Sequence, residues 1–167
     1  MNSLPPVTPP LTLRPATPED RAFLTAVHAS TREAELALTG WSDEQKAAFC
    51  AQQFHAQESH YRQHYPTAQY FVIECEKQPA CRLYVDHQEN EIRLMDIALL
   101  REFRGKGIGT HLLQELQKEA QNAAKVLTIH VESFNPAKRL YTRLGFVITE
   151  DKGVYQFMTW TPETALQ

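Results

Sequence analysis

Residues 101–113, REFRGKGIGTHLL, place three glycines within five positions, directly ahead of a leucine-rich segment. Inside a helix, Gly105, Gly107 and Gly109 would each cost about 1 kcal/mol relative to alanine. Glycine is favoured instead where the backbone needs a positive φ, or where a ligand approaches the main chain closely. The first turn of a helix also carries unpaired N–H groups and the positive end of the helix dipole. The stretch therefore predicts a loop and a helix start that bind an anion such as phosphate.

The segments on either side of this loop predict a parallel strand pair. Residues 91–100 read as a strand, and residues 126–132 read as a second strand. The helix between them repeats an apolar residue at every fourth position: Ile108, Leu112, Leu116 and Ala120. A strand–helix–strand run of this kind predicts two parallel strands joined by a right-handed crossover.

Caps, turns and periodicity predict the other elements. One helix begins after the Thr17 cap and runs toward Arg32, and a second begins after Ser42 and runs to about Tyr65. Further strands are predicted at residues 11–16, 69–75, 80–86, 146–149 and 154–160, with a short helix capped by Asn135 and carrying Pro136 at its first position. The order β-α-α-β-β-β-α-β-α-β-β indicates a mixed α/β sandwich.

Length and composition predict one globular domain. The chain has 167 residues, of which 43% are hydrophobic, and we expect a flexible tail at residues 1–10 and a single domain at residues 11–162. A net charge of −3 argues against a nucleic-acid partner. The sequence has no apolar run of about 20 residues, which argues against a membrane span. Three cysteines and no basic–apolar leader predict free thiols and a cytoplasmic location.

Two common phosphate-binding loops do not fit the glycine spacing. A nucleotide-hydrolase loop needs four residues between its first glycine and a Gly-Lys-Ser/Thr group, whereas here Lys106 precedes the second glycine. A dinucleotide-binding loop needs the spacing G-x-G-x-x-G and an acid about 20 residues later. This chain has G-x-G-x-G and no matching acid after the next strand. A glycine-rich turn without a ligand is the simplest alternative.

The spacing RGKGIG at residues 104–109 resembles the acyl-coenzyme-A pyrophosphate loop of the GNAT superfamily of N-acyltransferases. The family pattern, Gln/Arg-x-x-Gly-x-Gly/Ala, is matched by Arg104, Gly107 and Gly109. A second stretch, NPAKRLYTRLGF at residues 135–146, is similar to the family's block of an asparagine followed by Leu-Tyr-x-x-x-Gly-Phe. The element order resembles the family's fold as well. That fold is a mixed, mostly antiparallel sheet with a central splayed parallel strand pair and helices on both faces.

The resemblance implies an acetyl-CoA-dependent N-acetyltransferase. The acetyl group would pass from the co-substrate to a primary amine of a small molecule or protein by direct attack in a ternary complex, without a metal. The family's pantetheine arm lies between the splayed strands, where it would contact Asn135 and the backbone of Ile97, Ala98 and Leu99. The pyrophosphate would be held by the backbone of Arg104, Gly105, Lys106, Gly107, Ile108, Gly109 and Thr110, with the Thr110 hydroxyl as a further donor.

The same resemblance implies a proton donor for the leaving thiolate. Tyr141 occupies the tyrosine position of the family block, and a positioned phenol can act as a general acid. A tyrosine that only packs in the core is the structural alternative.

The proton acceptor has three alternatives. A primary ammonium with a pKa near 10 must lose a proton before it can attack at neutral pH. Glu91 precedes Arg104 by thirteen residues, the spacing at which lysine and ribosomal N-terminal acetyltransferases of the family carry a base glutamate. Asp96 interrupts an apolar strand, nominally on the face of Leu94, where a carboxylate needs a partner. The third alternative is ordered water.

The amine acceptor is not specified by the sequence. Trp41 lies between the first two helices, where the family builds its acceptor pocket. Acidic residues in the same region hint at a cationic acceptor: Glu33, Glu35, Asp43 and Glu44. His60 and His64 are one helical turn apart but lack a third metal ligand. A non-catalytic acyl-CoA sensor on the same fold is the alternative function, and a homodimer is left open.

Overall fold

The computed structural model describes residues 11–163, so the predicted tail at residues 1–10 lies outside the described residues. The helices are α1 (Arg21–Leu36), α2 (Asp43–His64), α3 (Ile108–Ala123) and α4 (Lys138–Arg143), with short 3-10 turns at Pro18–Asp20 and Arg101–Phe103. The strands are β1 (Leu11–Pro15), β2 (Gln69–Cys75), β3 (Gln78–His87), β4 (Glu91–Leu99), β5 (Val126–Glu132), β6 (Val147–Asp151) and β7 (Tyr155–Trp160). The predicted order of elements is confirmed.

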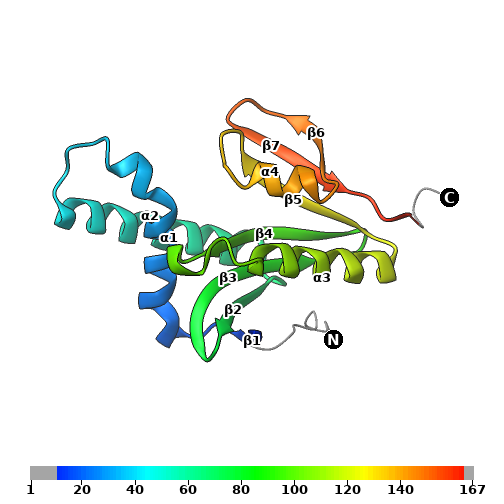
Figure 1. Cartoon of the computed structure of the whole chain (residues 1–167), viewed down its shortest axis with the longest axis horizontal. Coiled ribbons are helices and arrows are strands. Elements are labelled where there is room, and N and C mark those ends of the chain that lie inside the picture. Colours follow the sequence, from blue (N-terminus) through cyan, green and yellow to red (C-terminus); the bar gives the residue numbers. More distant parts are fainter. Residues whose placement is uncertain (1–10, 164–167) are drawn as a thin grey trace.

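The strands form one seven-stranded sheet with the order β1-β2-β3-β4-β5-β7-β6. All neighbouring strands are antiparallel except β4 and β5, which are parallel as the strand–helix–strand run predicts. Figure 1 shows that β5, β6, β7 and α4 form a lobe that diverges from β4. The mixed, mostly antiparallel sheet with one central parallel pair is therefore confirmed.

Helices cover both faces of the sheet. Phe71 and Ile73 of β2 belong to the main core, which includes the apolar side of α3. Val72, between them, points to the other face and packs with Leu24 of α1 and Phe54 of α2. Because side chains alternate along a strand, these contacts place α3 on one face and α1 and α2 on the other. None of the helices in residues 11–163 is both long and apolar enough to cross a membrane.

The predicted start of α2 is confirmed, and the predicted start of α4 is not. The Ser42 hydroxyl accepts a hydrogen bond from the Gln45 N–H, and the Gln45 side chain accepts one from the Ser42 N–H, which forms a capping box at the start of α2. The predicted start of the short helix at Pro136 is wrong, because residues 135–137 form a turn and α4 begins at Lys138. All three cysteines are free thiols, as predicted.

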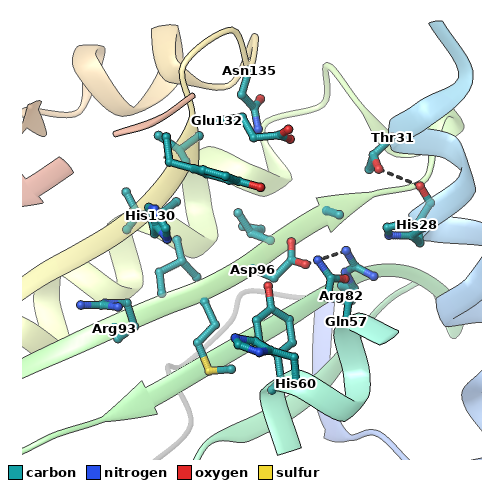
Figure 2. Close-up of a pocket in the computed structure, with 18 of the residues that line it drawn as sticks. His28, Thr31, Gln57, His60, Arg82, Arg93, Asp96, His130, Glu132 and Asn135 are labelled. Carbon is teal, nitrogen blue, oxygen red and sulfur yellow. Dashed lines mark hydrogen bonds and ion pairs between the residues drawn. The ribbon is translucent and has the colours of Figure 1, made fainter. Parts of the chain in front are cut away.

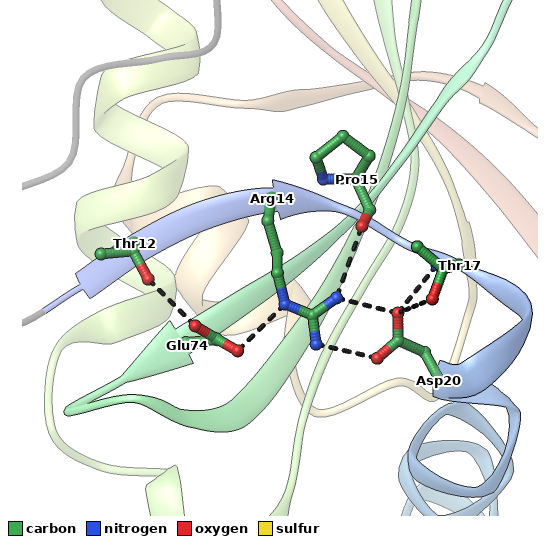
Figure 3. Close-up of polar contacts among 6 residues, drawn as sticks. All are labelled: Thr12, Arg14, Pro15, Thr17, Asp20 and Glu74. Atoms are coloured by element: carbon green, nitrogen blue, oxygen red, sulfur yellow. Dashed lines mark hydrogen bonds and ion pairs between the residues drawn. The ribbon is translucent and has the colours of Figure 1, made fainter.

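An ion-pair network joins the N-terminal strand to the first helical turn (Figure 3). Arg14 donates to both oxygens of Asp20, at 2.8 and 2.9 Å, and to Glu74 at 3.0 Å. The Thr17 N–H also donates to Asp20, whose side chain is largely buried. The hydrogen bonds from Arg14 lower the pKa of the Asp20 carboxyl from 3.8 to about 2. The charged form of Asp20 therefore stabilises the folded chain.

We expect Asp20→Asn to lower the free energy of unfolding by about 2 kcal/mol at pH 7. Because the folded pKa lies below the unfolded value of 3.8, this contribution is complete above about pH 5 and is lost as the pH falls toward 2. Urea unfolding of both proteins at pH 7 and near pH 3 measures the difference. Glu19→Gln, at the neighbouring exposed acid, is the matched control and should change stability by less than about 0.5 kcal/mol. A deficit in Asp20→Asn that does not shrink at low pH would contradict the electrostatic origin.

Candidate functional site

The central strand pair separates partway along its length. β4 and β5 are paired from Glu91 opposite Val126 to Leu94 opposite Ile129, and no pairing continues beyond that point in the described residues. A cavity of about 400 Å³ lies at this divergence, with residues 94–98 and 129–132 among its walls (Figure 2). Backbone N–H and C=O groups on the open side of β4 need partners, so they are available to a ligand in the cleft. Of the predicted backbone contacts, Ile97 and Ala98 line this cavity.

A β-bulge in β4 turns Asp96 toward this cavity. Tyr84 of β3 lies opposite Asp96, and the next residue, Val85, lies opposite Leu94, so β4 contains one extra residue, Met95. Leu94 packs in the main core, whereas Asp96 lies on the sheet face covered by α1 and α2. Strict alternation predicted Leu94 and Asp96 on one face, and this prediction is wrong because the bulge reverses the alternation.

Asp96 is paired with a buried arginine of the neighbouring strand. The Nη2 atom of Arg82 donates to Oδ2 of Asp96 at 2.6 Å. The Arg82 side chain is 3% exposed and the Asp96 side chain 16%, so the carboxylate is the member of the pair that is more accessible from the cavity. Arg82 Nε and Nη1 have no partner within the described part of the chain. The ion pair with Arg82, which also lines the cavity, therefore fixes the position of the Asp96 carboxylate.

Tyr141 lines the same cavity from α4. Its side chain is buried, and its hydroxyl makes no hydrogen bond to another described residue. Burial raises the pKa of the Tyr141 phenol, and the negative charge of Asp96 raises it further. The phenol therefore keeps its proton at neutral pH and can donate it to a ligand.

The remaining walls come from the two long helices and from the end of β5. Arg32 of α1 forms an ion pair with Glu132 of β5 at 3.5 Å, which links the two sides of the cleft. Burial lowers the pKa of His28 and of His130, so both imidazoles are neutral at pH 7. Rings and polar groups of α2, and of the residue that follows it, complete the wall: Gln57, His60, Tyr61 and Tyr65.

The acidic residues that hinted at a cationic acceptor do not line this cavity among the described residues. Glu33 pairs with Arg101, and Glu35 pairs with Arg32. Trp41 packs edge-on against Phe49 at 5.3 Å and is likewise outside the cavity walls. The hint therefore has no support in the geometry of the site.

Glu91 lies away from the cavity, at the first position of β4. Its Oε2 atom accepts a hydrogen bond from the Thr128 hydroxyl at 2.5 Å and pairs with Arg93 at 3.1 Å. A strand rises about 3.3 Å per residue, so five residues separate Glu91 from Asp96 by roughly 16 Å. The structure brings Asp96 and Tyr141 to one cavity and holds Glu91 outside it.

The glycine stretch forms a second cavity, of about 380 Å³, at the start of α3. Gly105 and Gly107 have φ values of +74° and +82°, a conformation that disfavours other residues. A Cβ at either position would meet no atom within 4 Å, so both glycines border open space. Leu99, predicted to contact the pantetheine arm, lines this cavity together with most residues of the predicted phosphate loop: Arg104, Gly105, Gly107, Ile108, Gly109 and Thr110.

The side chains of the two basic residues of the loop, Arg104 and Lys106, make contacts within the protein. The Arg104 guanidinium donates to the carbonyl of Leu99 and to the hydroxyl of Ser30 in α1, both at 3.1 Å. The ammonium of Lys106 lies 5.8 Å from the ring centroid of Phe103, and Lys106 is not among the residues that line the cavity in the described chain. The loop therefore presents chiefly backbone groups to a ligand.

Asn135 lies where the main cavity meets a further cavity along α4. Its side-chain oxygen accepts a hydrogen bond from the Ala137 N–H at 2.9 Å, so it caps the turn that precedes α4. The side-chain amide makes no hydrogen bond to another described residue, which leaves its N–H groups for a ligand.

Sequence reasoning missed several residues of this site. His28 and Gln57 carry no pattern that distinguishes them from other polar residues of their helices. Arg82 does carry a signal, because a charged residue interrupts the apolar strand ACRLYVD. A buried charge needs a partner of opposite sign, so Arg82 and Asp96 could have been paired from the sequence. The rings of His60 and His64 stack at 4.2 Å, and no set of three or more metal-ligating side chains occurs in the described residues.

Solved structures of known proteins resemble this fold. PaiA N-acetyltransferase from Thermoplasma acidophilum, in complex with coenzyme A, superposes with a TM-score of 0.67 at 18% identity, covering 90% of this chain and 98% of that one. An acetyltransferase from Thermus thermophilus gives 0.65 at 20% identity, covering 90% and 96%. RimL, a ribosomal α-N-protein acetyltransferase in complex with coenzyme A, gives 0.61 at 19% identity, covering 96% and 99%.

The similarity to solved structures supports the fold, whereas the family is given by comparison of the sequence with a family model. No curated protein matches the chain. A model of the acetyltransferase (GNAT) domain matches residues 37–164, which is more than half of the chain and includes the cleft of β4 and β5, the glycine loop and α4. The chain therefore belongs to the GNAT family of acetyltransferases.

Proposed function

We propose that this protein transfers an acetyl group from acetyl-CoA to a primary amine by direct attack within a ternary complex. The observation that carries the proposal is the single cavity at the divergence of β4 and β5, which is lined by both Asp96 and Tyr141. A carboxylate and a protonated phenol at one cleft supply the proton acceptor and the proton donor that aminolysis of a thioester needs. The amine acceptor would enter from the side of α1 and α2.

The two cavities fit the two ends of a pantetheine pyrophosphate. The glycine loop offers backbone N–H groups at the start of α3, a cradle with open space at Gly105 and Gly107, and Arg143 at its border. In this proposal, coenzyme A supplies the activated acetyl thioester. The backbone of Ile97, Ala98 and Leu99 positions the acyl carbonyl and the arm, and Asn135 contacts the arm from the end of β5.

Asp96 takes the proton of the acceptor ammonium in this proposal. Its carboxylate borders the cavity, and its ion pair with Arg82 holds it in one orientation. Glu91 has its hydrogen-bonding partners elsewhere and is separated from Asp96 by most of the strand. We therefore assign the acceptor role to Asp96, directly or through one ordered water.

Tyr141 donates its proton to the departing sulfur in this proposal. The phenol is buried, and the environment that raises its pKa keeps it protonated until the leaving group develops charge. A protein that only senses acyl-CoA would need the glycine loop but neither of these side chains. Release of free coenzyme A in the presence of a panel of amines distinguishes the enzyme from the sensor.

We expect acetyl-CoA to stabilise the protein by about 2.7 kcal/mol at a hundredfold excess over its Kd. For a chain of this size, that gain corresponds to a rise in Tm of roughly 5 to 11 °C. Gly107→Val should abolish the rise, because its side chain would occupy the cradle and its φ of +82° disfavours valine. A thermal-shift titration measures both effects.

Gly153→Val is the matched control for Gly107→Val. Gly153 has a φ of +83° and open space at its Cβ, but it lies in the turn between β6 and β7. The control should lose stability to a similar extent and keep the response to acetyl-CoA. If wild-type protein shows no change in Tm at millimolar acetyl-CoA, the proposed function is wrong.

A further inference from the structure

The main cavity contains buried guanidinium N–H groups that the proposed reaction does not use. Arg82 Nε and Nη1 and Arg32 Nε are buried and make no hydrogen bond to another described residue. They are the only buried guanidinium nitrogens without a partner in residues 11–163, and both side chains line this cavity. Because a buried donor without a partner is costly, these groups indicate a ligand that accepts their hydrogen bonds.

Arg82 keeps its charge although it is shielded from water. An arginine stays protonated at any pH at which the protein is folded, and this side chain is only 3% exposed. Its Nη2 atom donates to Asp96 at 2.6 Å. The other two nitrogens of the same guanidinium therefore need an acceptor from outside the described chain.

Arg32 brings a second positive charge to the same part of the cavity. Its Nη1 atom pairs with two acidic side chains, while its Nε has no acceptor in the described chain. Burial lowers the pKa of His28, and the charges of Arg82 and Arg32 lower it further. His28 therefore lies within electrostatic reach of both guanidiniums and adds no charge of its own. Figure 2 shows His28 and Arg82 beside Asp96.

The third arginine of the cavity wall, Arg93, has its partners within the protein. Its Nε donates to the Thr128 hydroxyl at 2.8 Å, and its Nη2 pairs with Glu91 at 3.1 Å. None of its nitrogens is a buried atom without a partner in the described chain. The unpartnered N–H groups are thus confined to the arginines of β3 and α1, on the side of the cavity where Asp96 lies.

A carboxylate is the acceptor that fits these groups. A guanidinium presents its N–H groups in a planar fork that matches the two oxygens of a carboxylate. Because the free nitrogens of Arg82 belong to the guanidinium that holds Asp96, a carboxylate bound there lies close to the proposed proton acceptor. The amine and the carboxylate must therefore be close together on the acceptor molecule. In an α-amino acid, a single carbon atom joins them.

We propose that the amine acceptor is a free α-amino acid, whose carboxylate is bound by Arg82 and Arg32 while Asp96 faces its amino group. The inference rests on the proposed function, because it concerns the acceptor of that reaction. It excludes polyamines, lysine side chains of proteins and protein N-termini as preferred acceptors, since none of them carries a carboxylate next to the reacting amine.

The product of this reaction is an N-acetyl amino acid. The amino nitrogen bonds to the acetyl carbon as the carbon–sulfur bond of the thioester breaks, and coenzyme A leaves as a thiol. The ammonium loses two protons in the process. One replaces the proton that Tyr141 gives to the sulfur, and the other passes through Asp96 to solvent.

The test measures release of coenzyme A with a panel of L-amino acids and, in parallel, with the carboxamide of each one. The carboxamide keeps the amine and the side chain but lacks the negative charge. Rates are expressed as kcat/KM for the unprotonated amine, because the carboxylate raises the pKa of the neighbouring amino group. A charge-assisted hydrogen bond corresponds to roughly a 10- to 100-fold effect, so wild-type protein should prefer its best amino acid over the carboxamide by that factor.

Three variants assign the preference to the two arginines. Arg82→Lys keeps a positive charge beside Asp96 but removes the planar fork, and it should reduce the preference to less than about threefold. Any effect on Asp96 acts on acid and carboxamide alike, so the ratio isolates the carboxylate contact. Arg32→Gln, which leaves the pair of Arg82 and Asp96 intact, should also reduce the preference. Arg93→Gln removes a charge from the same cavity wall and is the matched control, with the preference kept within about twofold.

The outcomes separate this inference from the function on which it rests. If coenzyme A is released but acids are not preferred over carboxamides, or if spermidine or a peptide with a free N-terminus is the better acceptor, the inference is overturned and the proposed function stands. A preference that survives both Arg82→Lys and Arg32→Gln also overturns it. If no amine releases coenzyme A, the proposed function itself fails. Should Arg82→Lys melt below the assay temperature, the wild-type ratio and Arg32→Gln decide.

Discussion

Replacing Tyr141 with phenylalanine is expected to lower kcat by about 10²- to 10⁴-fold while the fold and the affinity for acetyl-CoA are retained. The substitution removes one oxygen and keeps the ring, and the hydroxyl makes no hydrogen bond to a described residue that would be lost. The effect corresponds to about 3 to 5 kcal/mol in the activation barrier. Turnover, acetyl-CoA affinity and Tm are measured on the same preparation.

Tyr84→Phe is the matched control for this loss. Tyr84 is a buried tyrosine of β3 that is not among the residues that line the main cavity in the described chain. Removing its hydroxyl should leave turnover per folded molecule within about threefold of wild type. If Tyr141→Phe behaves like Tyr84→Phe, the phenol has only a packing role and the acyl-CoA sensor becomes the better description.

Asp96→Asn is expected to lower kcat by at least about 10²-fold, because the amide cannot accept a proton from the acceptor amine. The same substitution leaves the buried charge of Arg82 without its partner, which lowers stability by a few kcal/mol. Turnover is therefore expressed per folded molecule, with acetyl-CoA binding as the measure of an intact cleft. Glu91→Gln, at the other end of β4, should change kcat by less than about threefold.

Asp86→Asn controls for the loss of a buried carboxylate on the same face of the sheet. Asp86 of β3 is 4% exposed, accepts hydrogen bonds from Thr67 and Gln88, and lies outside the described walls of the cavity. Its amide variant should lose stability but keep its turnover per folded molecule. A larger loss in Glu91→Gln than in Asp96→Asn would restore Glu91 as the proton acceptor.

The long helices could be predicted because local chemistry specifies them. Ser42 and Gln45 are close enough in sequence to form a capping box without any help from the rest of the fold. In α3, the four-residue spacing from Ile108 to Ala120 identifies the buried side, because a helix places such residues on one face. The same reasoning found the parallel pair of β4 and β5.

Features that depend on strand register could not be predicted in this way. The turn between β2 and β3 is formed by Glu76 and Lys77, both with positive φ, although neither is a residue that usually marks such a turn. The extra residue Met95 has no signature of its own, yet it decides on which face Asp96 lies. Since a shift of one residue moves every later side chain to the other face, this one error changed the neighbours assigned to a site residue.

The glycine loop and the proposed proton acceptor show the same contrast. A positive φ is a local property, so Gly105 and Gly107 identify the loop from the sequence alone. The choice between Glu91 and Asp96 depends on where β4 leaves β5, which is a property of the whole sheet. The spacing to Arg104 could not reveal that Glu91 lies in the paired half of the strand, with Arg93 and Thr128 as its partners.

The short pairing of β4 with β5 divides the sheet into two halves that meet over only a few residues. Asp96 belongs to the half that contains β1 to β4, whereas Tyr141 follows β5 and belongs to the other half. The distance between the two side chains is therefore set by the angle at which the halves meet. A molecule that fills the cleft would contact both halves and so restrict the angle between them. In the proposed reaction, binding of the acyl donor would therefore also fix the distance between Asp96 and Tyr141.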